Sequence, residues 1–211
     1  MARTDATRSV AIFDLGGVLI EWDPRNLYRK LFAGDEAAME DFLANVCTPE
    51  WNEQQDAGRT FAEGTRELMP KHADKRDLIE AWGKRFGEMI PGAIVGAVEV
   101  LATLKQRGIP IYGVSNWSAE TFPPQRERFP FLSWFDDIVI SGVERVIKPD
   151  PRIFRILLER NAIAPESAVY VDDVARNAAA ATRLGIHGIH FRSPDQLRRE
   201  LTAVGLLTER S

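Results

Sequence analysis

The stretch SVAIFDLGGVLIEWD, residues 9–23, decides the fold of this chain. Apolar residues run from Val10 to Phe13, as in a strand that is buried on both faces of a parallel sheet. A lone carboxylate, Asp14, follows at the end of this run. Two residues on, where a second carboxylate would make a catalytic pair, the chain has Gly16. The stretch therefore predicts a buried strand that ends in a candidate catalytic carboxylate with no partner at position 16.

Length, charge and cysteine content limit the class of protein. The 211 residues fit one domain, or one domain that carries an insertion. The net charge of −4 argues against a nucleic-acid surface, which needs clustered positive charge, but it allows a locally basic site for a small anion. Cys47 is the one cysteine, so an intrachain disulfide is excluded, as is common in a reducing compartment. No apolar run reaches the length of a membrane span and no targeting segment is evident. We expect a cytoplasmic protein without a nucleic-acid or membrane partner; the sequence does not indicate its oligomeric state.

Four more apolar runs resemble the first and predict a parallel sheet. Each run is short and rich in valine and isoleucine, which is typical of strands buried on both faces. The five expected strands are 10–13, 109–114, 138–140, 168–171 and 188–191. Helical patterns at 93–107, 150–161 and 174–184 and a last helix capped by Ser193 separate or follow them. This alternation predicts right-handed crossovers and an α/β fold with a doubly wound parallel sheet.

The interval between Asp23 and Pro91 breaks this alternation. It holds no convincing strand and is too long for a simple crossover. Helical patterns occupy 27–32, 37–46, 61–69 and 75–89. We therefore expect a helical cap, residues 22–90, inserted after the first strand of a core made of residues 1–21 and 91–211.

Polar side chains follow four of the five expected strands. Ligands of an open parallel sheet bind beyond the carboxyl ends of its strands, so these side chains are expected to meet. They are Asp14, Ser115, Asn116, Ser141, Lys148, Asp172 and Asp173. This set suits phosphoryl transfer, because a carboxylate can be the nucleophile, Mg²⁺ prefers oxygen ligands, and hydroxyl and ammonium groups can stabilise phosphoryl oxygens. Gly16 and Gly17 would allow the backbone to approach an anion closely.

Four segments resemble, in order and spacing, the motifs of the haloacid dehalogenase superfamily. They are FDLGGVL (13–19), VSN (114–116), KPDPRIF (148–154) and VYVDDVARNAAAATRLG (169–185). The resemblance covers nearly the whole chain, including a cap between the first and second motifs. It implies a hydrolase of the group that contains haloacid dehalogenases and small-metabolite phosphatases.

The resemblance also implies a role for each matching residue. Asp14 would be the nucleophile that forms an aspartyl-phosphate, Ser115 would hydrogen-bond the phosphoryl group, and Lys148 would neutralise its charge. Mg²⁺ would be held by the set Asp14, the carbonyl of Gly16, Asp172 and Asp173. Asn177, four residues after Asp173, would orient the metal ligands.

Gly16 departs from the pattern of most phosphatases in the superfamily. They carry an aspartate here that serves as general acid and base, a role worth about 10²–10⁴-fold in rate. In one interpretation the protein is a phosphatase of a small phosphorylated metabolite with a labile leaving group, such as a sugar 1-phosphate. A donor elsewhere, from the set Glu21, Asp23, Glu53 and Asp56, is an equivalent solution. The subgroup that includes glucose-1-phosphate phosphatases has FDLG in the first motif and the same paired aspartates in the fourth motif. Residues 114–141 also resemble this subgroup.

Two other interpretations remain open. A 2-haloacid dehalogenase would use Asp14 without a metal, because a halide leaves without a proton. Adjacent Asp172 and Asp173 would repel its anionic substrate unless a cation lay between them, which favours the metal-dependent phosphatase. The third interpretation is a catalytically impaired binding module, which the retained set of polar residues disfavours.

Candidate substrate-binding residues surround this set. Gly16, Gly17 and Asn116 belong to the strand ends, and Trp117 follows the second motif, where packing is an equal alternative. Between two expected cap helices lie the residues Trp51, Asn52, Gln54, Gln55 and Asp56. They indicate either a substrate-specificity loop or a surface helix whose tryptophan packs in the cap.

Overall fold

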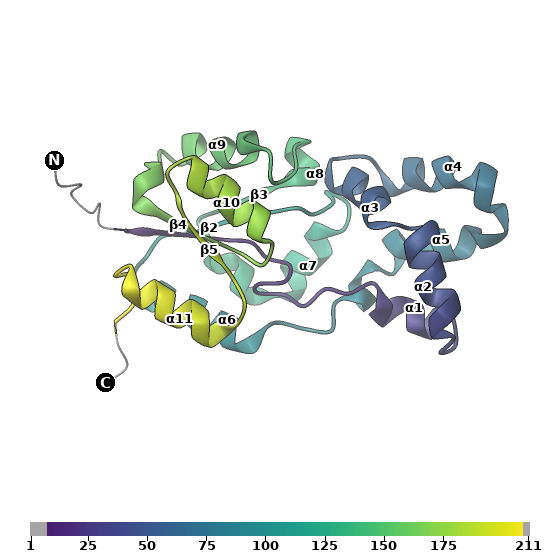
Figure 1. Cartoon of the computed structure of the whole chain (residues 1–211), viewed down its shortest axis with the longest axis horizontal. Coiled ribbons are helices and arrows are strands. Elements are labelled where there is room, and N and C mark those ends of the chain that lie inside the picture. The colour runs from purple at the N-terminus through teal and green to yellow at the C-terminus, as the bar shows by residue number, and fades with distance from the viewer. Residues whose placement is uncertain (1–7, 209–211) are drawn as a thin grey trace.

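Five parallel strands form one sheet at the centre of the computed structural model, which describes residues 8–208 (Figure 1). They are β1 (Val10–Phe13), β2 (Ile111–Ser115), β3 (Asp137–Ile140), β4 (Ala168–Asp172) and β5 (His187–His190). Every strand lies within two residues of the run predicted from the sequence. The predicted α/β fold with a doubly wound parallel sheet is confirmed.

Strand β1 lies in the middle of the sheet, whose order is β3-β2-β1-β4-β5. The chain builds from β1 outward to β3, crosses back to β4 beside β1, and then builds outward to β5. Phe13, the last residue of β1, pairs with Gly113 of β2 and with Val171 of β4. The point where the strand order reverses therefore lies directly beside the carboxyl end of β1, where such folds bind their ligands.

Helices cover both faces of the sheet (Figure 1). On one side lie α6 (Val95–Gln106) and α11 (Pro194–Ala203), and on the other α9 (Pro151–Arg160) and α10 (Ala175–Arg183). Alternate residues of β1 point to opposite faces: Ala11 and Phe13 join the α6–α11 cluster and Ile12 the α9–α10 cluster. The remaining short elements are α7 (Phe122–Arg128), α8 (Ser141–Glu144) and the 3₁₀ turns η3 (Pro130–Trp134) and η4 (Pro165–Ser167).

The segment between β1 and α6 is entirely helical in its regular structure, and we name residues 25–89 the helical insertion. It contains α1 (Arg25–Leu31), α2 (Glu36–Asn45), α3 (Pro49–Asp56), α4 (Phe61–His72), η1 (Ala73–Lys75), α5 (Arg76–Lys84) and η2 (Phe86–Met89). Figure 1 places these helices beyond the carboxyl end of β1. The sequence pattern predicted four of these helical stretches, but it left open whether residues 51–56 form a loop or a helix.

Local capping explains where two of these helices begin. Thr48 accepts a hydrogen bond from Trp51 N at 3.1 Å, and Pro49 occupies the first turn of α3. Thr60 and Glu63 form a reciprocal capping box at the start of α4. Residues 51–56 are thus helical because a threonine and a proline start a helix just before them.

Aromatic side chains fill the centre of the helical insertion. The ring of Tyr28 lies 4.9 Å from that of Phe42 and 5.8 Å from that of Trp82. Trp82 in turn meets Trp51 edge-on at 5.6 Å. These residues belong to the same buried cluster as Ala11 and Phe13 of β1, so the apolar core runs from the sheet into the insertion. Among residues 8–208, none of the helices is both long and apolar enough to cross a membrane.

Candidate active site

Asp14 lies at the carboxyl end of β1 with both carboxylate oxygens engaged. Its backbone N–H donates to the carbonyl of Val171 at 2.8 Å, which keeps the residue in register with β4. Oδ1 accepts hydrogen bonds from Leu15 N and from Ser115 Oγ, each at 2.8 Å. Oδ2 lies 2.7 Å from Lys148 Nζ. The contacts with Leu15, Ser115 and Lys148 thus hold this carboxylate in a single orientation.

Lys148 is a buried cation between two carboxylates. Its side chain is 1% exposed, and Nζ donates to Asp172 Oδ2 at 2.8 Å as well as facing Asp14. Asn116 fixes the backbone of this lysine, because its Nδ2 donates to the Lys148 carbonyl at 3.2 Å and its Oδ1 accepts from Lys148 N at 2.8 Å. The amide of Asn116, a predicted substrate ligand, is therefore already used to position the lysine.

Burial and charge act against each other in this pair. Burial lowers the pKa of Lys148, but the two carboxylates outweigh it, so the pKa is raised and the amine stays charged. Burial also raises the pKa of Asp14 to about 7, with Asp172 adding to this effect and Lys148 and Ser115 opposing it. The negative charge of Asp14 therefore depends on the buried lysine.

Asp172 is completely buried at the end of β4, and several protein groups donate hydrogen bonds to its carboxylate. Besides Lys148, the hydroxyl of Tyr170 donates to Oδ2, and Val174 N donates to Oδ1 at 2.8 Å. Asn177 Nδ2 lies 3.1 and 3.2 Å from the two oxygens. Asp172 thus joins β4 to the start of α10 and holds Lys148 beside Asp14.

Asp173 differs from its neighbour because it is exposed and reaches toward the first motif. Its carboxylate lies so close to the Cα of Gly17 that a β-carbon at position 17 would overlap it. Gly17 also has a φ of +73°, in the left-handed region that favours glycine. Two independent features therefore favour glycine at position 17: the left-handed backbone conformation and the close approach of the Asp173 carboxylate.

The three carboxylates form a set that fits a divalent cation. Asp14, Asp172 and Asp173 each offer an oxygen, and these atoms lie within 4.8 Å of one another. Hard oxygen donors are the ligands that Mg²⁺ prefers. Oδ1 of Asn177 is buried beside them and has no hydrogen-bond partner in the part of the chain that the structure describes. Such an orphaned acceptor fits a site where a hydrated cation binds.

A cavity of about 250 Å³ opens above Asp14. It brings together seven residues predicted from the sequence, namely Asp14, Gly16, Gly17, Ser115, Asn116, Trp117 and Asp173. It adjoins a cavity of about 700 Å³ that shares Asp14 and Asn116 and also includes Lys148 and Asn177. Trp117 is 4% exposed and packs on Phe86 at 5.9 Å, so it serves both as a wall of the cavity and as part of the core.

The structure does not bring Trp51 and Gln54 to this cavity. Trp51 is buried inside the helical insertion, where its Nε1 donates to the carbonyl of Gly64 at 3.2 Å. Gln54 is exposed and borders a separate surface hollow. Helix α3 instead presents Asn52 and Asp56 to the cavity. Of the two interpretations of this stretch, the structure shows the helix whose tryptophan packs inside the insertion. The substrate-binding role predicted for Trp51 and Gln54 is corrected, because Asn52 and Asp56 of the same helix meet the site instead.

Several lining residues were not predicted as site residues. They are Trp22, Phe86 and Val174, whereas Asn52 and Asp56 belong to the stretch for which a substrate-specificity loop was one interpretation, and Asp56 was also an alternative proton donor. The spacing of Asn52 and Asp56, four residues apart, is the one signal in the sequence that could have placed them on a common helix face.

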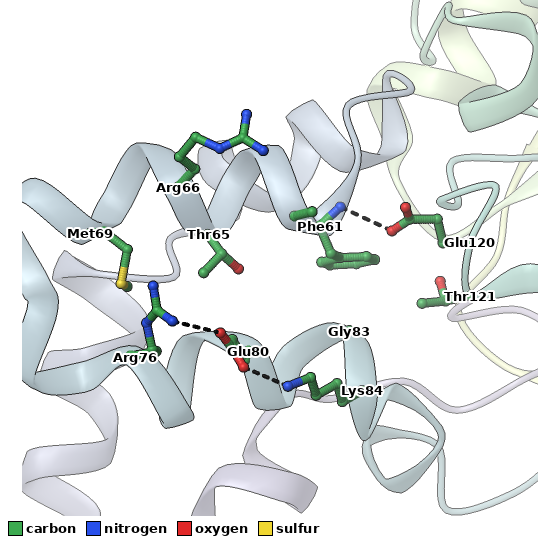
Figure 2. A pocket seen from close by; sticks show the side chains of 11 residues that line it. Phe61, Thr65, Arg66, Met69, Arg76, Glu80, Gly83, Lys84, Glu120 and Thr121 are labelled. Carbon is green, nitrogen blue, oxygen red and sulfur yellow. Dashed lines mark hydrogen bonds and ion pairs between the residues drawn. The ribbon is translucent and has the colours of Figure 1, made fainter.

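A different cavity, of about 670 Å³, lies between α4 and α5 (Figure 2). Two of its cations pair with one carboxylate, since Glu80 lies 3.9 Å from Arg76 and 2.5 Å from Lys84, whereas Arg66 lies apart from these pairs. Glu120 accepts a hydrogen bond from Phe61 N at 3.0 Å. The three clustered carboxylates and the buried lysine meet at Asp14, and this cavity is lined by none of them.

The sequence itself matches a known family. Residues 9–185 match the model of the haloacid dehalogenase-like hydrolases. The chain therefore belongs to this family of hydrolases, as the four motifs implied.

Individual relatives include two phosphatases. A sesquiterpene phosphatase of Aspergillus oryzae is 26% identical over 88% of this chain and 90% of its own length. A phosphorylated carbohydrates phosphatase of Thermotoga maritima is 27% identical over 85% of this chain and 82% of its own. The mouse acyl-CoA dehydrogenase family member 10 is 26% identical over 92% of this chain, which spans only 19% of that relative.

Solved structures share the fold. A predicted haloacid dehalogenase-like hydrolase of Porphyromonas gingivalis superposes with a TM-score of 0.71 at 21% identity, over 97% of this chain and all of that one. A family member from Bacteroides thetaiotaomicron, solved with magnesium and inorganic phosphate, has a TM-score of 0.64 at 24% identity, over 88% of this chain and 95% of its own.

Proposed function

We propose that this hydrolase is a Mg²⁺-dependent phosphatase that hydrolyses phosphomonoesters of small metabolites through an aspartyl-phosphate on Asp14. The observation that carries the proposal is the environment of Asp14. Its carboxylate lies 2.8 Å from Ser115 Oγ and 2.7 Å from Lys148 Nζ at the base of a cavity beside two further aspartates.

Each of these groups has a part in the proposed reaction. Asp14 attacks phosphorus, and the bond to the alcohol oxygen breaks. Ser115 donates a hydrogen bond to the phosphoryl group, and Lys148 neutralises charge as it develops on the phosphoryl oxygens. Asn116 and Asp172 hold Lys148 in place for this purpose.

The proposed Mg²⁺ ligands are Asp14, the carbonyl of Gly16, Asp173 and Asp172. When bound, the cation supplies positive charge that offsets the phosphate and the clustered carboxylates. Asp173 has the freest carboxylate of the three, because Asp172 already receives four protein donors. Asn177, with one amide end on Asp172 and the other unpartnered, is placed to orient this cluster.

The proposed substrate is a small phosphorylated metabolite. The resemblance of the first and fourth motifs to glucose-1-phosphate phosphatases favours a sugar phosphate, and the relatives include a phosphatase of phosphorylated carbohydrates. We also propose that residues 22–90 act as a cap that selects the substrate and excludes water, over a core of residues 1–21 and 91–211.

A phosphatase screen tests the proposal. The purified protein is expected to hydrolyse p-nitrophenyl phosphate and a subset of metabolite phosphates with Mg²⁺, and to lose this activity with EDTA. Asp14→Asn removes the nucleophile, and it is expected to abolish turnover while the circular dichroism spectrum is unchanged. Release of halide from 2-chloropropionate that EDTA leaves unaffected would instead support a dehalogenase. Activity retained in Asp14→Asn would exclude the proposed mechanism.

A further inference from the structure

The proposed reaction needs a proton for its leaving oxygen, and position 16 offers no group that could supply one. The space at this position is open, because a β-carbon on Gly16 would meet no atom within 4 Å. Gly16 lines the cavity of Asp14, so the place of a proton donor is left empty on the side of the first motif. This inference rests on the proposed phosphatase function and asks which residue donates the proton.

Most other carboxylates near the site are committed elsewhere. Asp23 accepts a hydrogen bond from Arg25 N at 2.9 Å and lies 3.4 Å from the guanidinium of the same arginine. Glu53 lies 3.3 Å from Arg176 and is 42% exposed. Glu21 is exposed and does not line either cavity at Asp14. Glu40, which pairs with Arg25, and Glu50 line only the larger of the two cavities. Asp56 lines both cavities together with Asp14.

The structure fastens Asp56 to the core of the molecule. It is the last residue of α3, and its carbonyl accepts a hydrogen bond from Ser141 Oγ at 2.6 Å. Ser141 follows β3 and also accepts from Trp117 N at 2.9 Å, just beyond Ser115 at the end of β2. The Asp56 carboxyl accepts from Asn52 Nδ2 at 3.0 Å, one turn earlier on the helix. Its position is therefore set by the same strand ends that hold Asp14.

The environment of Asp56 suits a group that both gives and takes a proton. Burial raises the pKa of its carboxyl to about 7, with Glu53 on its own helix and Asp14 from β1 adding to this effect. Lys148 from the core and a backbone hydrogen bond at Ser118 act in the opposite direction. A general acid works best when its pKa lies near the working pH, and this value meets that condition.

We propose that Asp56, supplied by the helical insertion, is the general acid and base that replaces the side chain missing at Gly16. As Asp14 attacks phosphorus, the bond between phosphorus and the ester oxygen breaks, and the proton of Asp56 moves to that oxygen to release an alcohol. The Asp56 carboxylate then takes a proton from the water that attacks the aspartyl-phosphate. Inorganic phosphate leaves, Asp14 is restored as a carboxylate, and Asp56 is again protonated.

The test compares two substrates that differ in their need for a proton. The leaving group of 2,4-dinitrophenyl phosphate departs as a stable anion and needs no proton. The leaving group of an alkyl phosphate such as glycerol 1-phosphate must receive a proton to depart. Asp56→Asn is expected to lower kcat/KM on the alkyl phosphate by about 10²-fold or more and to change that on the aryl phosphate by only a few-fold. The retained aryl activity of the same variant shows that it is folded. Asp41→Asn, the same carboxylate-to-amide change at an exposed residue of α2 that lines neither cavity, is the matched control and is expected to leave both activities unchanged.

Gly16→Asp provides a rescue, since the space at position 16 can accept the side chain. In the Asp56→Asn background it is expected to restore much of the alkyl phosphate activity. In the unmodified enzyme, kcat on the alkyl phosphate is expected to fall as the pH rises above about 7, because Asp56 loses its proton. This decrease of kcat with pH is expected to be absent in Asp56→Asn.

Two outcomes would overturn the proposal. Equal losses on both substrates would mean that Asp56 only supports the structure, and no loss on either would mean that it has no part in the reaction. A different result tests the proposed function separately. If the unmodified enzyme, with Mg²⁺, does not hydrolyse even 2,4-dinitrophenyl phosphate, then the phosphatase assignment is wrong and the proposal for Asp56 falls with it.

Discussion

The two adjacent glycines of the first motif show how much a single position can constrain the site. Gly17 has a positive φ and lies against Asp173, whereas Gly16 has neither constraint. We predict that Gly17→Ala lowers the free energy of unfolding by about 1–3 kcal/mol, because alanine strains the turn and its methyl group displaces the aspartate. Urea unfolding followed by circular dichroism measures this difference.

Gly16→Ala is the control at the neighbouring position. Its methyl group meets open space, so we expect a change of unfolding free energy well below that of Gly17→Ala. Similar losses in the two variants would show that neither the backbone turn nor the contact with Asp173 is the reason for glycine at position 17.

At the scale of elements, helix α10 rests on strand β5 at a glycine. A β-carbon on Gly188 would overlap the carbonyl of Ala178 and lie 2.6 Å from Thr182 Oγ1, both on α10. We predict that Gly188→Ala forces the helix outward, lowers the unfolding free energy by about 1–3 kcal/mol, and lowers kcat in the phosphatase assay because Asn177 moves with the helix. Thermal unfolding and steady-state kinetics measure the two effects.

Gly92→Ala is the matched control, because its methyl group meets no atom within 4 Å. We expect near-normal stability and kcat from it. A Gly188→Ala variant as stable as this control would contradict the close packing of α10 on β5.

The elements also show which parts of the structure the sequence could predict. Buried parallel strands are continuous apolar runs, so all five were located, and the residues at their ends could be expected to meet. Helix α3 was harder, because it is short and mostly polar and its position depends on packing between segments distant in the sequence. The face of α3 that meets the cavity is set by Trp51, which packs on Trp82 and leaves Asp56 on the wall of the cavity that also holds Asp14. A contact of this kind has no signature in a single sequence.

At the scale of the whole molecule, sheet and insertion share one apolar core. Ala11 and Phe13 of β1 belong to the same buried cluster as Tyr28, Phe42 and Trp82 of the insertion. Neither part can expose its share of this core without affecting the other. We predict that the helical insertion and the sheet unfold together in urea, with a common midpoint. Hydrogen exchange measured by mass spectrometry at increasing urea, on peptides from 36–84 and from 168–190, follows the two parts separately.

The opposite result has a clear form. If peptides of the insertion lost protection at a lower urea concentration than those of the sheet, the insertion would be a separate folding unit, and the shared cluster would contribute little to its stability.

The open space at Gly16 has a consequence at the level of the gene. Glycine and aspartate codons can differ by a single nucleotide, and a side chain at this position meets no atom within 4 Å of its first carbon. Neither steric packing nor the genetic code therefore bars a carboxylate from position 16. Because Asp56 of the helical insertion supplies the proton in the proposed mechanism, the enzyme does not need a second donor at position 16. A mutation of this codon to aspartate would therefore add a redundant acid.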